Sequence, residues 1–133
     1  MKGERGNMLI LGIGIWAFVC VLLAGSVALS IVALERRELV AQADSIALTV
    51  ADDLNDELYY AGAQHYLPDG RDVVVTAQRL TSGDTRIGDP TGVRNGMVVV
   101  TLSRSVPLAF VPEGMPFKNV RIESTSYAIL RER

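Results

Sequence analysis

One long run without a charged side chain limits what this chain can fold into. From Met8 through Leu34 the sequence contains no Asp, Glu, Lys or Arg. About 20 residues of helix cross the hydrocarbon core of a bilayer, so this run of roughly 27 residues is long enough to do so. Charged residues border the run on both sides, at positions 2–5 and 35–38. The sequence therefore predicts a transmembrane helix over residues 8–34.

A cleaved secretory leader is the first alternative to a retained helix. Such leaders have an apolar core of about 7–15 residues, followed by small residues at the cleavage site. The tripeptide Ser26-Val27-Ala28 fits that site, but the apolar run continues beyond it to Glu35. We therefore expect the helix to be retained, with residues 1–7 as a short N-terminal leader or cytoplasmic segment. Basic residues on the two sides nearly balance, and the α-amino group favours a cytoplasmic N-terminus and an exported C-terminal domain.

The helical pattern continues beyond the predicted span. No Gly or Pro occurs between Ser26 and Tyr60, so the span and residues 35–60 can form one helix of roughly 50 residues, about 75 Å long. Apolar residues in the second part recur every three or four positions and form one face. That face consists of Leu39, Ala43, Ile46, Ala47, Val50, Leu54 and Leu58. Five acids occupy other faces, where we expect them to be solvated, namely Asp44, Asp52, Asp53, Asp56 and Glu57.

Residues 61–133 have the pattern of a small β domain. Alternating and β-branched residues predict three strands, over residues 73–78, 97–106 and 119–130. Residues 81–96 are rich in Gly, Asp, Thr, Pro and Asn and predict an exposed loop. A small sheet of this kind needs one face covered, and the apolar face of the helix is available for that purpose. We therefore predict an α+β fold, in which a long N-terminal helix packs through residues 39–58 on a three-stranded antiparallel sheet.

The sequence offers no recognisable catalytic or metal-binding arrangement. His65 is the single histidine, and the single cysteine, Cys20, lies inside the apolar run. The helical acids lack the spacing of a calcium loop, and Asp84 and Asp89 belong to the predicted loop. No phosphate-binding glycine loop, serine elbow or zinc spacing occurs. No basic tract suggests nucleic-acid binding. We therefore expect a protein that is not an enzyme and has neither a cofactor nor a nucleic-acid partner.

Short motifs surround the predicted span in a particular order. Arg5-Gly6 precedes it, Arg36-Arg37 follows it, and Gln42, Ala43, Asp44, Ala47 and Leu48 lie in the alanine-rich stretch beyond. Over about the first 55 residues this order resembles the TadE/TadG-like proteins of the tight-adherence (Flp, type IVb) pilus apparatus. The resemblance implies a pilin-like fold and a minor subunit or accessory protein of pilus assembly. It also implies a single-pass protein of the bacterial cytoplasmic membrane, whose partners are membrane lipid and other pilin-like subunits.

The sequence departs from the processed pilins of this class at one position. Those pilins are cleaved after a glycine that is followed, five residues later, by glutamate, whereas the fifth residue after Gly6 is Leu11. Cleavage between Gly6 and Asn7 therefore remains an open alternative to an uncleaved N-terminus. A second alternative is a generic single-span anchor that carries a small extracytoplasmic binding or sensing domain. That alternative predicts a flexible linker near Glu35, and the sequence has no Gly or Pro there.

Overall fold

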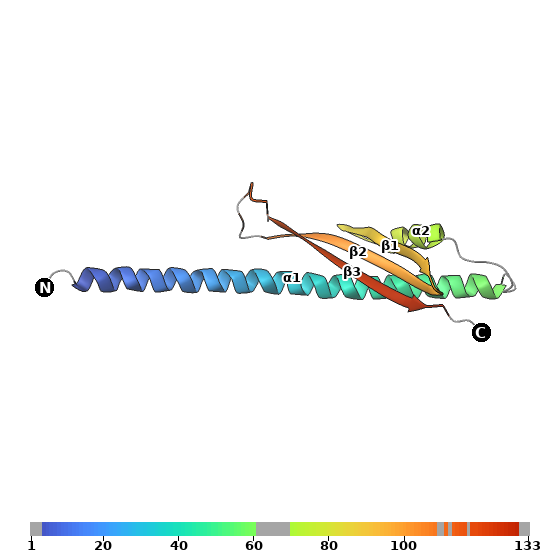
Figure 1. Ribbon diagram of the computed structural model, residues 1–133, viewed down its shortest axis with the longest axis horizontal. Coiled ribbons are helices and arrows are strands. Elements are labelled where there is room, and N and C mark those ends of the chain that lie inside the picture. The colour runs from blue at the N-terminus through green and yellow to red at the C-terminus, as the bar shows by residue number, and fades with distance from the viewer. Residues whose placement is uncertain (1–3, 61–69, 109–110, 112, 117, 131–133) are drawn as a thin grey trace.

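A computed structural model describes residues 4–60, 70–108, 111, 113–116 and 118–130. Helix α1, Glu4–Tyr60, is a single unbroken helix, and helix α2, Gly70–Leu80, follows it. Three strands follow within the described residues, β1 over Thr85–Arg94, β2 over Met97–Pro107 and β3 over Asn119–Ile129. Figure 1 shows α1 as a long rod whose C-terminal half carries the other elements. We call α2 and the three strands together the head.

The three strands form one antiparallel sheet in the order β1-β2-β3. A tight turn at Asn95-Gly96 joins β1 to β2, and both residues have positive φ, 51° and 72°. This is the combination that two-residue hairpin turns of the type I′ class require. Strands β2 and β3 pair without interruption from Met97 opposite Ile129 to Pro107 opposite Asn119. This long and regular pair of strands is also the part of the sheet that packs against α1.

Strand β1 is irregular in its middle, where the register with β2 shifts between Gly88 and Gly92. A side chain replaces the missing backbone partner there, because the Thr101 amide donates to Thr91 Oγ1 at 3.1 Å. The Thr101 hydroxyl in turn donates to the Pro90 carbonyl at 2.7 Å. The buried polar groups at this bulge are thus satisfied, which allows a strand with two glycines and a proline to remain in the sheet.

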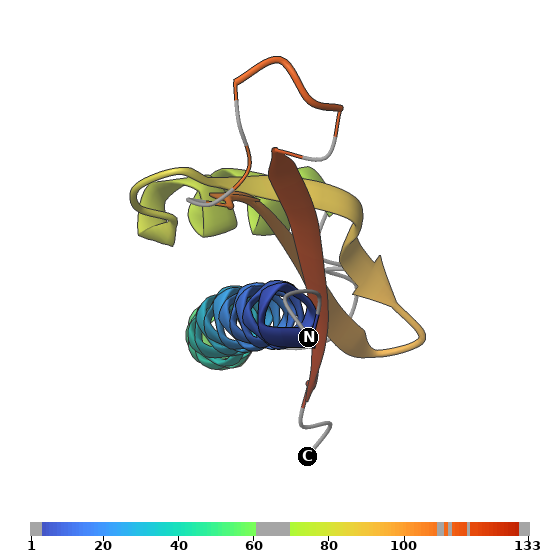
Figure 2. The same ribbon diagram turned by 90° about the vertical axis from the view of Figure 1, so that its left-hand side faces the viewer.

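Both helices cover the same face of the sheet (Figure 2). Side chains at alternate positions of β2, from Val98 through Leu102, point to that face and are buried. Ile122 and Ala128 of β3 contribute from the neighbouring strand. The helices supply the rest of one continuous core: Leu39, Ala43, Ile46, Ala47, Val50, Ala51 and Leu54 from α1, and Val73 and Ala77 from α2.

The predicted α+β arrangement of a long N-terminal helix and a small antiparallel sheet is confirmed, but one strand was assigned to the wrong segment. Residues 73–78 were expected to form a strand and instead lie within α2. The expected loop over residues 81–96 contains β1. Helix is favoured in α2 because Val73 and Ala77, four residues apart, both enter the core. Asp72 in the first turn and Arg79 in the last also suit the helix dipole.

Candidate membrane span and helix-head junction

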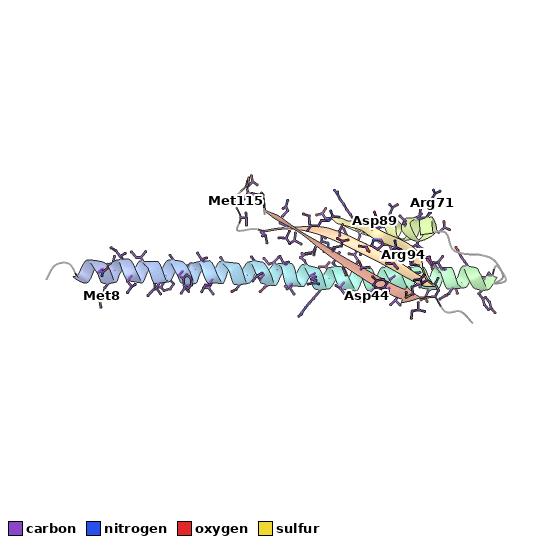
Figure 3. The ribbon with its side chains drawn as sticks, viewed as in Figure 1. Met8, Asp44, Arg71, Asp89, Arg94 and Met115 are labelled. Atoms are coloured by element: carbon purple, nitrogen blue, oxygen red, sulfur yellow. The ribbon has the colours of Figure 1, made fainter. Side chains whose placement is uncertain are left out.

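The N-terminal half of α1 is an apolar helix without a protein cover. Met8 is 80% exposed, Trp16 72% and Leu29 74%. Figure 3 shows side chains projecting above and below this half of the rod, with Met8 near its free end. Soluble proteins rarely leave an apolar surface of this extent in water. Helix α1 is long and apolar enough to span a membrane, and its most apolar stretch is not buried by any part of the head.

The polar side chains near the end of this stretch are compatible with lipid. Ser26 Oγ donates to the Leu22 carbonyl and Ser30 Oγ donates to the Ser26 carbonyl, each at 2.9 Å. A hydroxyl bonded to a carbonyl one turn earlier satisfies its donor inside the helix. Because hydrocarbon offers no water to replace such a bond, this arrangement lowers the cost of placing serine in a span.

A polar network joins α1 to the head just after the apolar run. Arg104, on the covered face of β2, donates from Nη1 to Glu35 Oε2 at 2.8 Å and from Nη2 to Gln42 Oε1 at 3.2 Å. Its Nε donates to Thr85 Oγ1 of β1 at 3.0 Å. We call Glu35, Gln42, Thr85 and Arg104 the junction network. The Arg104 side chain is only 16% exposed, and its planar fork, on β2, meets acceptors from both α1 and β1, so it fixes the register of the sheet on the helix.

A second polar contact lies further along α1. Ser126 of β3 donates its hydroxyl to Asp44 Oδ1. Asp44 was expected to be solvated. It is exposed on α1, as labelled in Figure 3, but it also binds the sheet. The two contacts, Arg104 with Gln42 and Ser126 with Asp44, hold β2 and β3 at defined positions along one helix.

The residues of the predicted packing face lie together in the core. Leu39, Ala43 and Ala47 are completely buried, and Ile46, Val50 and Leu54 are at most 5% exposed. The side chain of Leu58 lies outside the described residues. The residues that carry the family resemblance after the span fall into two groups. Gln42 and Asp44 contact the head, and Arg36 and Arg37 are exposed. Gly6 and Asn7 lie within the first turns of α1, both exposed.

Those remaining candidate residues that the structure describes form no common site. Asp52, Asp53, Asp56 and Glu57 are exposed on α1, and His65 lies outside the described residues. Within the part of the chain that the structure describes, no group of three or more His, Cys, Asp or Glu could hold a metal ion.

Sequence reasoning missed Arg104, Thr85 and Ser126 as junction residues. A signal was present for Arg104, because it follows Val98, Val100 and Leu102 at every second position of β2. A cation at an inward position of a strand needs a buried partner. The partner itself, Glu35, could not be chosen from the sequence, since several acids follow the apolar run.

A polar groove of about 760 Å³ lies on the head near this junction. Arg104 lines it together with Asp84, Arg86, Ser103 and Arg121. Three arginines and one aspartate thus line the groove, and Arg104 among them is already paired with Glu35.

The chain matches no protein-family model, no curated protein and no solved structure. A function for it therefore has to follow from its own residues and geometry.

Proposed function

We propose that this protein is a membrane-anchored, pilin-like minor subunit or accessory protein in the assembly of a tight-adherence (Flp, type IVb) pilus or a related secretion system. The apolar half of α1 lies in the bacterial cytoplasmic membrane with its N-terminus on the cytoplasmic side, and the head is extracytoplasmic. One observation carries the proposal above the others. A single helix is both the exposed apolar rod and the central element of the head's core.

The continuity of α1 separates this function from simple anchoring. An anchor needs a span and a linker, and the head could then fold without it. Here the core residues of α1 run from Leu39 through Leu54, and Val32, inside the apolar run, packs against that core. Removing the helix would uncover the buried faces of β2 and β3. The head and the apolar rod are therefore one rigid unit, as expected of a subunit that must pack side by side with others through its helix.

The residues that carry the family resemblance also have a structural role that suits it. Gln42 and Asp44 are the polar positions of the alanine-rich stretch, and each accepts a hydrogen bond from the sheet. Ala43 and Ala47 between and beyond them are fully buried, so their small side chains let the strands approach the helix closely. Gln42, Ala43, Asp44 and Ala47 thus belong to the face of α1 on which the sheet packs, whereas the matching residues Arg36, Arg37 and Leu48 are exposed.

The second candidate is a single-span anchor with a small binding or sensing head, and the polar groove beside Arg86 and Arg121 is the observation that favours it. It requires no contact between the head and the span. The junction network and Val32 join them directly, which makes this the weaker candidate.

The assembly function is tested by deleting the gene in the native bacterium and comparing surface filaments sheared from the cells. We expect the deletion to reduce or abolish the filaments and the full chain to restore them. An Ile46→Asp chain, whose head cannot fold, should fail to restore them, whereas Leu48→Asp on the exposed side should succeed. Normal filaments in the deletion strain would overturn the proposal. Recovery of the protein in sheared filaments, rather than in the membrane, would assign it as a subunit.

Processing is tested separately by the intact mass of protein taken from its native membrane. A mass short of residues 1–6 would identify cleavage between Gly6 and Asn7. The full mass would assign the protein as an uncleaved accessory factor, and a mass beginning after Ala28 would contradict the retained span.

A further inference from the structure

The connection between β2 and β3 lies at the end of the head that is nearer the apolar, N-terminal half of α1. The Glu35–Arg104 ion pair, at 2.8 Å, fixes where β2 passes the end of the apolar run. Strand β2 continues for three more residues, to Pro107. At about 3.3 Å per residue this extension covers about 10 Å. Figure 1 shows that it runs obliquely along α1 toward the N-terminus.

That distance places the connection level with the apolar run along the direction of α1. About 10 Å along a helix corresponds to roughly six or seven residues, so the end of β2 is level with α1 residues before Leu34. Two observations agree with this position. Val32 packs against the head's core, and Figure 3 places Met115 between Met8 and Asp44 along the direction of α1.

The described side chains of the connection suit a partly apolar environment. Leu108 and Val111 are half-buried, and Met115, near the tip, is 47% exposed. The sequence from 108 to 118 contains one acid and one base, Glu113 and Lys118. These two pair with each other, with Lys118 Nζ 2.7 Å from Glu113 Oε1, so their net charge is zero.

Three backbone hydrogen bonds join described residues of the connection to one another. The Leu108 amide donates to the Lys118 carbonyl at 2.7 Å, and the Lys118 amide donates to the Met115 carbonyl at 3.2 Å. The Val111 amide donates to the Leu108 carbonyl, also at 3.2 Å. Donors that are already bonded reduce the cost of moving a loop into a layer with little water.

We propose that the β2–β3 connection is a second membrane contact, which places Leu108, Val111 and Met115 in the interfacial layer of the bilayer beside the end of the span. The hydrocarbon core needs about 20 of the roughly 27 uncharged residues, so about seven remain for the interface. The connection is level with these remaining residues. Arg36 and Arg37 follow the apolar run on α1, and Arg121 lies near the start of β3. All three are exposed, and their long side chains can reach lipid phosphates. This proposal rests on insertion of α1 in the membrane but not on assembly of a pilus.

The contact is tested with an environment-sensitive fluorophore on single cysteines, in nanodiscs that hold one copy of the full chain. The wild-type chain has only Cys20, in the span, and Cys20→Ala provides a cysteine-free background. In that background Met115→Cys places the label on the connection. Asn95→Cys places it at the β1–β2 turn, at the opposite end of β2. Lipids of phosphatidylcholine and phosphatidylglycerol carry a nitroxide quencher either near the headgroup or at the chain end.

We expect the headgroup quencher to reduce the fluorescence at position 115 severalfold more than at position 95. The chain-end quencher should act most strongly on Cys20, which reports insertion of α1. Equal and weak quenching at 115 and 95, with Cys20 quenched, would overturn the membrane contact while leaving the span intact. A label at 115 that responds only when several copies share a disc would assign the surface to a neighbouring subunit and equally overturn it. Absence of quenching at Cys20 would refute the insertion on which the proposal rests.

Discussion

The Arg104 guanidinium on β2 lies 2.8 Å from the Glu35 carboxylate, the first charged group after the apolar run of α1. The same guanidinium also donates to Gln42 and Thr85. A residue 69 positions away in the sequence thus connects the end of the apolar run to the sheet. The head is thereby held at one level on the rod.

Replacing Arg104 by Met should destabilise the head by about 2–3 kcal/mol, because it removes three hydrogen bonds and leaves the partly buried Glu35 carboxylate without its donor. The measurement is pulse proteolysis of the full chain in mild detergent over a urea series. A double-mutant cycle with Glu35→Gln should give a coupling energy of about 1 kcal/mol or more. Arg36→Met, at an exposed position, is the matched control and should change stability by less than about 0.5 kcal/mol. Additive effects of Arg104→Met and Glu35→Gln would show that the ion pair contributes nothing to docking.

Replacing Ile46 by Asp should unfold the head. Ile46 is 4% exposed on the face of α1 that the sheet covers, so the substitution buries an unpaired charge and costs more than about 4 kcal/mol. Val50→Asp, at 1% exposure, should have the same effect. Leu48 lies on the opposite side of the same turn and is 61% exposed, so Leu48→Asp should be tolerated. Unchanged protease resistance of both Ile46→Asp and Val50→Asp would contradict the packing of α1 on the sheet.

Replacing Asp44 by Ala should destabilise the head by about 1–2 kcal/mol, because the buried Ser126 hydroxyl loses its acceptor. Ser126→Ala should cost less, and the double variant should cost little more than Asp44→Ala alone. Asp52→Ala is the control, since Asp52 is exposed. The same proteolysis series measures all four variants. A cost for Asp52→Ala equal to that for Asp44→Ala would point to a general charge effect on the helix in place of a specific contact.

The sequence correctly predicted those elements whose residue pattern is compatible with only one kind of secondary structure. An uncharged run followed by a three- and four-residue apolar repeat without Gly or Pro allows one continuous helix, and α1 is that helix. The alternating inward residues of β2 and β3 likewise predicted two strands correctly. In β3, Ile122, Ser126 and Ala128 share one face of the strand, and all three are buried.

The segment between α1 and β2 was assigned incorrectly because two local signals conflicted with tertiary packing. Three consecutive valines at positions 73–75 favour a strand by intrinsic preference. Only Val73 and Ala77 of α2 are buried, however. Residues four positions apart lie on one face of a helix, and this face of α2 packs into the core with α1 and the sheet. In β1 the glycines and Pro90 are residues typical of loops, so the sequence did not indicate a strand. The bulge between Gly88 and Gly92 also interrupts the two-residue alternation of a regular strand.

The Asn95-Gly96 pair was the sequence signal that could have identified β1, and it makes a further prediction. Gly96 has φ of 72°, where a β-branched residue is strained, and an added Cβ would meet no atom within 4 Å. Gly96→Val should therefore destabilise the head by about 1–2 kcal/mol through backbone strain alone. Gly70→Ala is the control, because a Cβ there makes only ordinary contacts at the start of α2. It should be neutral or stabilising by up to about 1 kcal/mol. If Gly96→Val is as stable as the wild type by the urea proteolysis series, the turn does not hold the register of β1 on β2.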